Sequence, residues 1–344
     1  MLSGNLFGLE IEDLVSFVAS IGEKPFHGRQ IYNWIYKQRI FDFAQMGNLS
    51  KNLRENLKQK ASVCLPIIAK KERSGDGTIK LLLEMSDGQR IETVYIPDGD
   101  RHTACLSSQV GCALKCVYCA TGKIGFKRNL SCGEIVAQLF CLESVVGKKM
   151  TNVVMMGMGE PLMNCEALFK AIRLMADPDG IGFSKRKISI STSGWLPGIK
   201  ELINVNPRVK LALSLNATTD KFHAELMPIV ARYPIRDLIS VSAQYARISG
   251  YPLTVGYLLL AGKNDSEEDA RRLVKLLNGR DAKVNLMEYN EIDAEVKPST
   301  SKSVERFVEI VGNAGITVTM RTSKGESISG ACGQLAAGYQ EKFS

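Results

Sequence analysis

From about residue 103 onward the sequence alternates short apolar segments with amphipathic ones, and this alternation constrains the fold more than any other feature. Apolar runs have the length of strands, and the segments between them place apolar residues at helical spacing. Repeated alternation of this kind predicts a parallel sheet with helical crossovers, either an open sheet or a full or partial barrel, with ligands at the C-terminal ends of the strands. The expected strands are 103–109, 152–157, 187–192, 209–215, 253–260, 283–288 and 317–321, and the expected helices are 133–146, 165–176, 236–247, 265–277 and 302–314.

The first seventy residues have a different pattern, typical of short helices at 9–21, 28–39 and 51–61, the last with Ser50 as a candidate N-cap. Strands are expected next at 67–73, 78–85 and 90–96, with a turn at 86–89. Between Lys24 and Arg73 there are eleven basic and three acidic residues, so this stretch carries the same +8 charge as the whole chain. Such a cationic module suits a phosphate-rich partner, although a solvated helix surface would look the same.

Composition and the lengths of the apolar runs limit the size of the core and the cellular location. A chain of 344 residues with 45% hydrophobic residues can bury a large core, in one large domain or in a large domain with a small companion. No apolar run approaches the roughly 18 residues that span a bilayer, and the N-terminus does not resemble a signal peptide, so we expect a cytoplasmic protein without a membrane partner. Thiols stay reduced there, and an odd count of nine cysteines then indicates metal, cluster or redox chemistry.

The strongest local signal is a C-x3-C-x2-C run formed by Cys112, Cys116 and Cys119, directly after an expected strand. Three thiolates on one loop can bind three irons of a four-iron four-sulfur (4Fe-4S) cluster and leave the fourth iron open to a small chelating molecule. The alternative is zinc, with Cys105 or His102 as the fourth ligand, although structural zinc sites usually have two separated ligand pairs.

This cysteine spacing resembles the cluster motif of the radical S-adenosylmethionine (SAM) superfamily. Further motifs are similar to those of the RlmN/Cfr family of RNA methyltransferases, and the resemblance runs from about residue 28 to residue 339. These motifs are CLSSQVGC at 105–112, CATG at 119–122, NL at 129–130, MMGMGEP at 155–161, STSG at 191–194 and ACGQL at 331–335.

The resemblance implies an α/β fold: a partial parallel (β/α) barrel of the radical SAM type, with a small N-terminal helical domain and a connecting β hairpin. The implied domains are a basic RNA-binding domain at 1–73, the hairpin at 74–97 with Glu92, the radical SAM core at 98–330 and a C-terminal segment at 331–344 with Cys332.

It also implies a chemistry. The adenine carbons C2 and C8 are electron-poor, so they cannot attack the methyl group of SAM directly. In the family, the residue matching Cys332 takes a methyl group from one SAM, and a 5′-deoxyadenosyl radical from a second SAM, bound to the 4Fe-4S cluster, removes hydrogen from that methyl group. The resulting carbon radical adds to the base, Cys105 then forms a transient disulfide with Cys332, and Glu92 is the general base. Two SAM molecules are used per turnover, and the electron donor is of the flavodoxin and flavodoxin reductase type.

Each role has a structural alternative. Cys332 lies between small residues but could be a buried structural thiol, and Cys105 alone would be taken for a core cysteine. Glu92 could be an exposed carboxylate on a strand, and the serines that match SAM contacts could be helix caps. We expect Cys64, Cys132, Cys141 and Cys165 to be packing residues. The SAM-binding positions implied by the resemblance are Gly159, Glu160, Ser191, Ser214, Leu215, Asn216 and Asn290.

Three positions depart from the family pattern. Ser327 stands where the family usually has Asp, Asn216 where it usually has His, and Glu291 where a proline is common. These departures bear on the geometry of bound SAM, on the Cys332 loop and on the RNA target, whereas the cluster and the two-cysteine chemistry stay intact.

The leading hypothesis is therefore C2 methylation of an adenosine in 23S ribosomal RNA and in transfer RNA, by a monomer. The alternative within the family is C8 methylation, which confers antibiotic resistance, although Gly-Glu-Pro at 159–161 favours C2. A radical SAM enzyme with a non-RNA substrate, or a non-enzymatic metal-stabilised RNA-binding protein, would be a different class. A radical SAM enzyme with a non-RNA substrate would leave the basic module and Cys332 unexplained.

Overall fold

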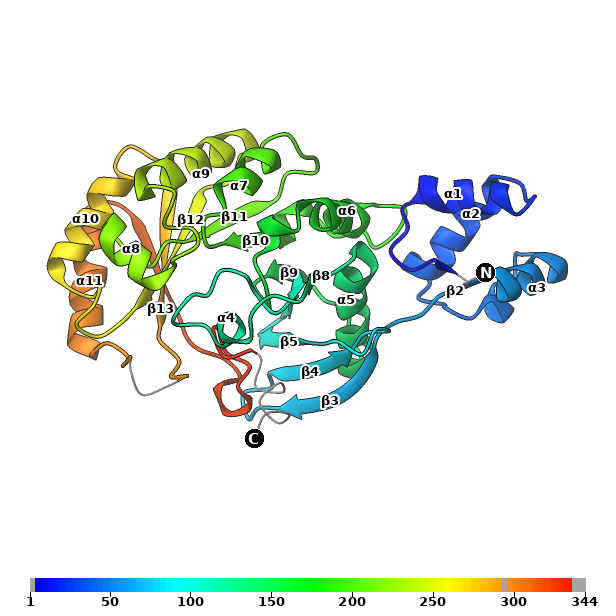
Figure 1. Cartoon of the computed structure of the whole chain (residues 1–344), viewed down its shortest axis with the longest axis horizontal. Helices are drawn as coiled ribbons and strands as arrows, with labels where there is room; N and C mark the ends of the chain where they lie inside the picture. The colour runs from blue at the N-terminus through cyan, green and yellow to red at the C-terminus, as the bar shows by residue number, and fades with distance from the viewer. Residues whose placement is uncertain (1–3, 293–295, 336–344) are drawn as a thin grey trace.

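The computed structural model describes residues 4–292 and 296–335. In this part of the chain one large sheet of ten strands runs in the order β14-β13-β12-β11-β10-β9-β6-β5-β4-β3. The run from β6 to β14 is parallel throughout and curves into an open barrel, as Figure 1 shows. The predicted partial parallel barrel is thus confirmed. Its strands are β6 (Arg101–Cys105), β9 (Asn152–Met155), β10 (Ile188–Thr192), β11 (Lys210–Ser214), β12 (Leu253–Leu259), β13 (Ala282–Glu288) and β14 (Thr317–Arg321).

Three antiparallel strands extend the sheet beyond β6: β5 (Arg90–Asp98), β4 (Ile79–Glu84) and β3 (Ile67–Arg73). The turn expected at 86–89 joins β4 to β5, closed by a 2.8 Å hydrogen bond from the Met85 amide to the Gln89 carbonyl. β3 is the edge strand of this large sheet, although its residues fall in the N-terminal domain expected from the sequence. The domain boundaries as a whole stay a prediction.

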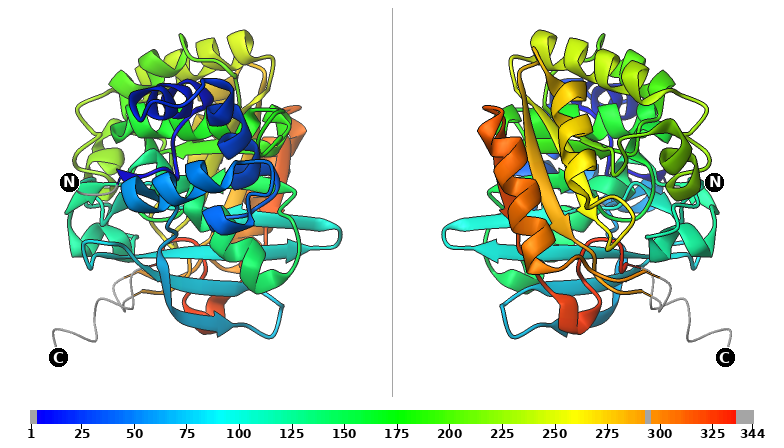
Figure 2. Two further views of the ribbon diagram at one scale, coloured as in Figure 1. Left: turned by 90° about the vertical axis from the view of Figure 1, so that its right-hand side faces the viewer. Right: turned by 90° about the vertical axis from the view of Figure 1, so that its left-hand side faces the viewer.

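Helices cover the outer face of the curved sheet (Figures 1 and 2). In α5, one of the longest helices, local sequence fixes both ends. The helix begins at a reciprocal capping box between Ser131 and Glu134 and ends at Gly147, whose φ of +72° suits glycine. The short helices α4, α7 and α8 escaped the sequence analysis because five to seven residues show too little periodicity. The helices of this part are α4 (Ala120–Ile124), α5 (Cys132–Val146), α6 (Cys165–Ala176), α7 (Leu196–Leu202), α8 (Asp220–Leu226), α9 (Ile235–Ser249), α10 (Glu267–Leu277) and α11 (Ser301–Asn313). No helix of the described ranges is long and apolar enough to cross a membrane.

The N-terminal residues form a helical unit beside α5 and α6, at one end of the molecule (Figure 1). It contains α1 (Ile11–Ser20), α2 (Phe26–Tyr32), a π-helical turn at Asn33–Lys37 and α3 (Lys51–Lys60), which Ser50 caps as expected. The Tyr32 hydroxyl donates to Asp177 at 2.5 Å, and the guanidinium of the half-buried Arg39 pairs with Glu143 of α5 at 3.1 Å. These contacts tie the basic unit to the barrel.

Candidate active site

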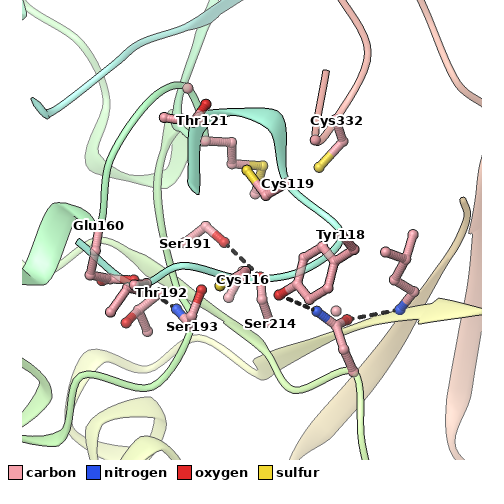
Figure 3. A pocket seen from close by; sticks show the side chains of 18 of the residues that line it. Cys116, Tyr118, Cys119, Thr121, Glu160, Ser191, Thr192, Ser193, Ser214 and Cys332 are labelled. Carbon is pink, nitrogen blue, oxygen red and sulfur yellow. Dashed lines mark hydrogen bonds between the residues drawn. The ribbon is translucent and has the colours of Figure 1, made fainter. Parts of the chain in front are cut away.

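The three cysteines of the C-x3-C-x2-C run lie on the loop between β7 (Gln109–Val110) and α4, at the carboxyl ends of the parallel strands. All three line one cavity, where Figure 3 shows Cys116 and Cys119. Gly111, with a φ of +72°, starts the loop, and the Cys112 amide donates to the Gly125 carbonyl at 3.2 Å, which closes it. The sequence pattern thus becomes a single set of thiols that face one space.

These thiols suit a cluster better than a single ion. Burial raises the pKa of the Cys112 thiol to about 12 and also raises the pKa values of Cys116 and Cys119, so binding iron would release protons from all three. In the described ranges, no three His, Cys, Asp or Glu side chains converge tightly enough to hold one metal ion. A 4Fe-4S cluster needs a wider arrangement because each thiolate binds a different iron. The donor set and its shared cavity fit that group.

The same cavity is lined by Glu160, the carboxylate expected just after the strand at 152–157. Its side chain is buried, and its two oxygens accept hydrogen bonds from the amides of Leu162, at 3.1 Å, and Ser193, at 2.8 Å. Burial raises the pKa of Glu160 to about 7, and these hydrogen bonds limit the rise. A carboxylate fixed in this way could bind a ligand's ammonium group. The adjacent Gly159, at a φ of +96°, also lines the cavity.

Strand ends supply the polar floor. Ser191 of β10 and Ser214 of β11 lie side by side, with their hydroxyls 3.2 Å apart, and neither caps a helix (Figure 3). Asn216 lines the same cavity; it donates to the Tyr118 hydroxyl at 2.8 Å and accepts from the Leu258 amide at 2.8 Å. Leu215 is buried and does not line either cavity.

A second, smaller cavity adjoins the first and contains the two thiols expected to form the transient disulfide. Cys332 lines both cavities and is exposed, whereas Cys105, on β6, is buried and lines only the second. Figure 3 shows Cys332 beside Cys119. Asn290 also lines the second cavity and donates to the Cys332 carbonyl at 3.1 Å. Cys332 therefore lies between the three-cysteine loop and Cys105.

Burial controls the chemistry of Cys105. It raises the pKa of this thiol to about 12, and the positive charge of Arg321 opposes the rise. Arg321, at the end of β14, lines both cavities. Sequence reasoning missed Arg321, Tyr118 and Met287 in these walls. Their places at strand ends or beside a cluster cysteine were the signals that could have found them.

Glu92 lies outside both cavity linings of the described residues. It is nevertheless on the same face of the sheet as Cys105: Cys105 pairs with Val94, and residues two apart on a strand share a face. Its side chain is only 3% exposed and pairs with Lys80, itself 4% exposed, at 3.1 Å. The alternative of an exposed carboxylate is wrong.

The four remaining cysteines divide differently from the expectation. Cys132 and Cys141 are buried in the core, but Cys165 is half-buried and Cys64 is exposed. Cys64 follows the end of a short strand, where its backbone is held by the Asn5 side chain at 2.9 and 3.0 Å. A packing role for Cys64 is therefore wrong.

Parallel β/α units in an open barrel, with a three-cysteine loop over the carboxyl ends of its strands, define a radical SAM enzyme. The family model of the radical SAM superfamily matches residues 106–274, and the model of the ribosomal RNA large subunit methyltransferase N-terminal domain matches residues 4–63.

Solved structures extend the comparison. A radical SAM methyltransferase from Sphaerobacter thermophilus is 39% identical, with a TM-score of 0.92, and the match covers 97% of this chain and 99% of that one. More distant matches are a domain of pyruvate-formate lyase-activating enzyme from Bacteroides vulgatus (16% identity, TM-score 0.39, 50% and 99% covered) and SuiB from Streptococcus suis bound to S-adenosylmethionine (14% identity, TM-score 0.46, 64% and 47% covered). The chain belongs to the RlmN-like family of radical SAM methyltransferases. Membership implies a 4Fe-4S cluster and SAM as cofactors.

Proposed function

We propose that this enzyme methylates C2 of an adenosine in 23S ribosomal RNA and in transfer RNA. The observation that carries the proposal is the position of Cys332, which lines both the cavity of the cysteine loop and the cavity of Cys105. A thiol in this position suits a methyl carrier: it can accept a methyl group in the cofactor cavity, and the second thiol can then release the product from it.

When bound, the cluster and two SAM molecules per turnover supply the methyl group and the radical chemistry. Glu160 would bind the SAM ammonium group, and Ser191, Ser214 and Asn216 would contact the rest of the molecule. Cys112, Cys116 and Cys119 would hold the cluster. Gly159 lines this pocket, and Leu215, which is buried and lines neither cavity, would act only by holding its neighbours Ser214 and Asn216 in place. Asn290, from the second cavity, would act through its hydrogen bond to the Cys332 carbonyl.

Cys332 carries the methyl group on its sulfur and links the protein covalently to the base. Before release, the adduct must lose the unpaired electron left by the radical addition, with the cluster as its acceptor. Release then requires Cys105 as a thiolate: its sulfur attacks the sulfur of Cys332, an S–S bond forms, and the electron pair of the breaking C–S bond stays with the methylene carbon, which takes up a proton to become the methyl group of the base. Glu92 would accept the proton that the ring carbon loses. A reductant must then return the disulfide to two thiols before the next turnover.

The RNA partner is supported by the family model at residues 4–63 and by the basic character of the N-terminal unit. Lys24, Arg29, Lys37, Lys51 and Lys60 are all exposed there. An electron donor of the flavodoxin and flavodoxin reductase type, a monomeric state and a cytoplasmic location complete the proposal.

The test is mass spectrometry of nucleosides from RNA treated with the anaerobically reconstituted enzyme, with Cys332→Ala as control. We expect 2-methyladenosine from the native enzyme and none from the variant. 8-Methyladenosine would assign the C8 reaction instead, and SAM cleavage without any RNA methylation would point to a non-RNA substrate. Stoichiometric iron and sulfide support the cluster, whereas tight zinc without iron would overturn the mechanism.

A further inference from the structure

The turn between β3 and β4 contacts the loop that leads to Cys332, although some 250 residues separate them in sequence. Asp76, at the tip of this turn, accepts a hydrogen bond from the Gly325 amide through Oδ2, at 2.9 Å. Through Oδ1 it accepts from the Thr78 amide, also at 2.9 Å, which shapes the turn itself. A second contact joins the hydroxyls of Ser74 and Ser327 at 2.9 Å.

The partner loop is closed on itself at this contact. The Gly325 carbonyl accepts from the Gly330 amide at 2.9 Å and from the Ile328 amide at 3.2 Å, so 325–330 forms one tight unit. Gly325 is buried at a φ of +72°, and a Cβ there would lie 2.7 Å from Cγ2 of Thr78. The close approach therefore requires glycine. Cys332 follows this unit by two residues.

The chain is held again just after Cys332. The Gly333 carbonyl accepts from the Ala120 amide at 2.7 Å, and the Leu335 carbonyl accepts from the Thr121 hydroxyl at 2.7 Å. Both donors directly follow Cys119 of the cysteine loop. Cys332, itself exposed, thus lies on a short span between two anchors, one on the β3–β4 turn and one on the cysteine loop.

The charge on Asp76 strengthens the first anchor. Its partial burial would raise the pKa of this carboxyl, but the hydrogen bonds from the Thr78 and Gly325 amides outweigh that effect and lower the pKa to about 2. Asp76 is therefore a carboxylate at neutral pH. Hydrogen bonds to an ionised acceptor are stronger than those between neutral groups.

From this geometry we infer that Asp76 is a positioning residue for Cys332: the β3–β4 turn, through Asp76 and Ser74, holds the 325–330 loop so that the Cys332 sulfur stays within reach of both cavities. The inference rests on the proposed role of Cys332 as methyl carrier. Ser327, one of the departures from the family pattern, belongs to this contact, and its neutral hydroxyl meets Ser74 without placing a second carboxylate beside Asp76.

The test compares Asp76→Ala with Asp98→Ala in the reconstituted holoenzyme. Asp98 is an exposed carboxylate on the neighbouring β5–β6 turn, and its ion pair is with Arg101 at 3.9 Å. Hydrogen exchange followed by mass spectrometry reports on the 325–335 backbone. We expect Asp76→Ala to speed exchange at Gly325 and Gly330 about tenfold, because an anchored amide exchanges only when its local hydrogen bond opens. Asp98→Ala should leave exchange there unchanged.

The second readout is single-turnover transfer of a methyl group from SAM to Cys332, measured by intact mass without RNA. We expect Asp76→Ala to slow this transfer about tenfold while the Kd for SAM stays within twofold. Asp76→Asn keeps one acceptor oxygen, so its transfer rate should lie between those of the native enzyme and Asp76→Ala. Unchanged exchange, or faster exchange with unchanged methyl transfer, would overturn the inference. If the native enzyme itself never methylates Cys332, the proposed function fails, while the exchange comparison still decides whether Asp76 anchors the loop.

Discussion

Lys80 offers the sharpest test of how the sheet holds Glu92. Its side chain is 4% exposed and lies between two carboxylates, 3.1 Å from Glu92 and 3.3 Å from Glu72. Lys80→Met keeps the apolar stem and removes the charge, which leaves the buried Glu92 without this cation. Removing one partner of a buried ion pair destabilises a protein by about 3–5 kcal/mol.

The size of the effect can be converted into a melting shift. An unfolding entropy of about 2.1 cal/mol/K per residue amounts to about 0.7 kcal/mol/K for this chain, so the loss corresponds to about 4–7 °C in Tm. Lys70→Met is the matched control, because Lys70 also lies 3.3 Å from Glu72 but is 53% exposed. An exposed pair of this kind contributes at most about 1 kcal/mol, or about 1 °C.

The assay is thermal unfolding followed by circular dichroism on anaerobic holoenzyme. The double variant Lys80→Met/Glu92→Gln should recover most of the lost Tm, because it also removes the buried negative charge that Lys80 balances in the native enzyme. Equal shifts for Lys80→Met and Lys70→Met, or no recovery in the double variant, would refute the reasoning.

Three further predictions concern the chemistry and the RNA. Cys105→Ala should trap a covalent protein–RNA adduct through Cys332, seen as a mass increase on denaturing gels; normal turnover without adduct would remove its resolving role. Because burial raises the pKa of Cys105 to about 12, its thiolate fraction grows about tenfold per pH unit below that value, so rapid-quench decay of the adduct should accelerate as pH rises. Arg321→Met should slow decay at each pH, and a pH-independent decay would contradict this control by ionisation. Replacing exposed lysines of the N-terminal unit should flatten the salt dependence of RNA binding, by about 0.7–0.9 in log–log slope for each phosphate that the protein no longer neutralises, and an unchanged slope would assign them to a solvated surface. The lysines to replace are Lys51 and Lys60.

The sequence by itself determined the strands of the large sheet and its longer helices, and it indicated the cofactor chemistry. Strand and helix periodicities are local, so the parallel part of the sheet and helices such as α5 could be predicted within a few residues. The spacing of Cys112, Cys116 and Cys119 is also local, because one loop must present all three thiols. Ser191 and Ser214 could be placed at strand ends because strand periodicity is local.

Tertiary structure decided what the distant residues do. Only the fold brings Cys332 beside the cysteine loop and in reach of the cavity of Cys105, and only the order of strands puts Glu92 on the face that Cys105 shares. Burial is also a property of the packed molecule. Packing buries Glu92 together with Lys80 and leaves Cys64 exposed, and the burial of Cys105 raises the pKa of its thiol. The hydrogen bond between Asp76 and Gly325 joins segments that no local pattern connects. Charge, reach and reactivity depend on neighbours in space, which a linear pattern does not contain.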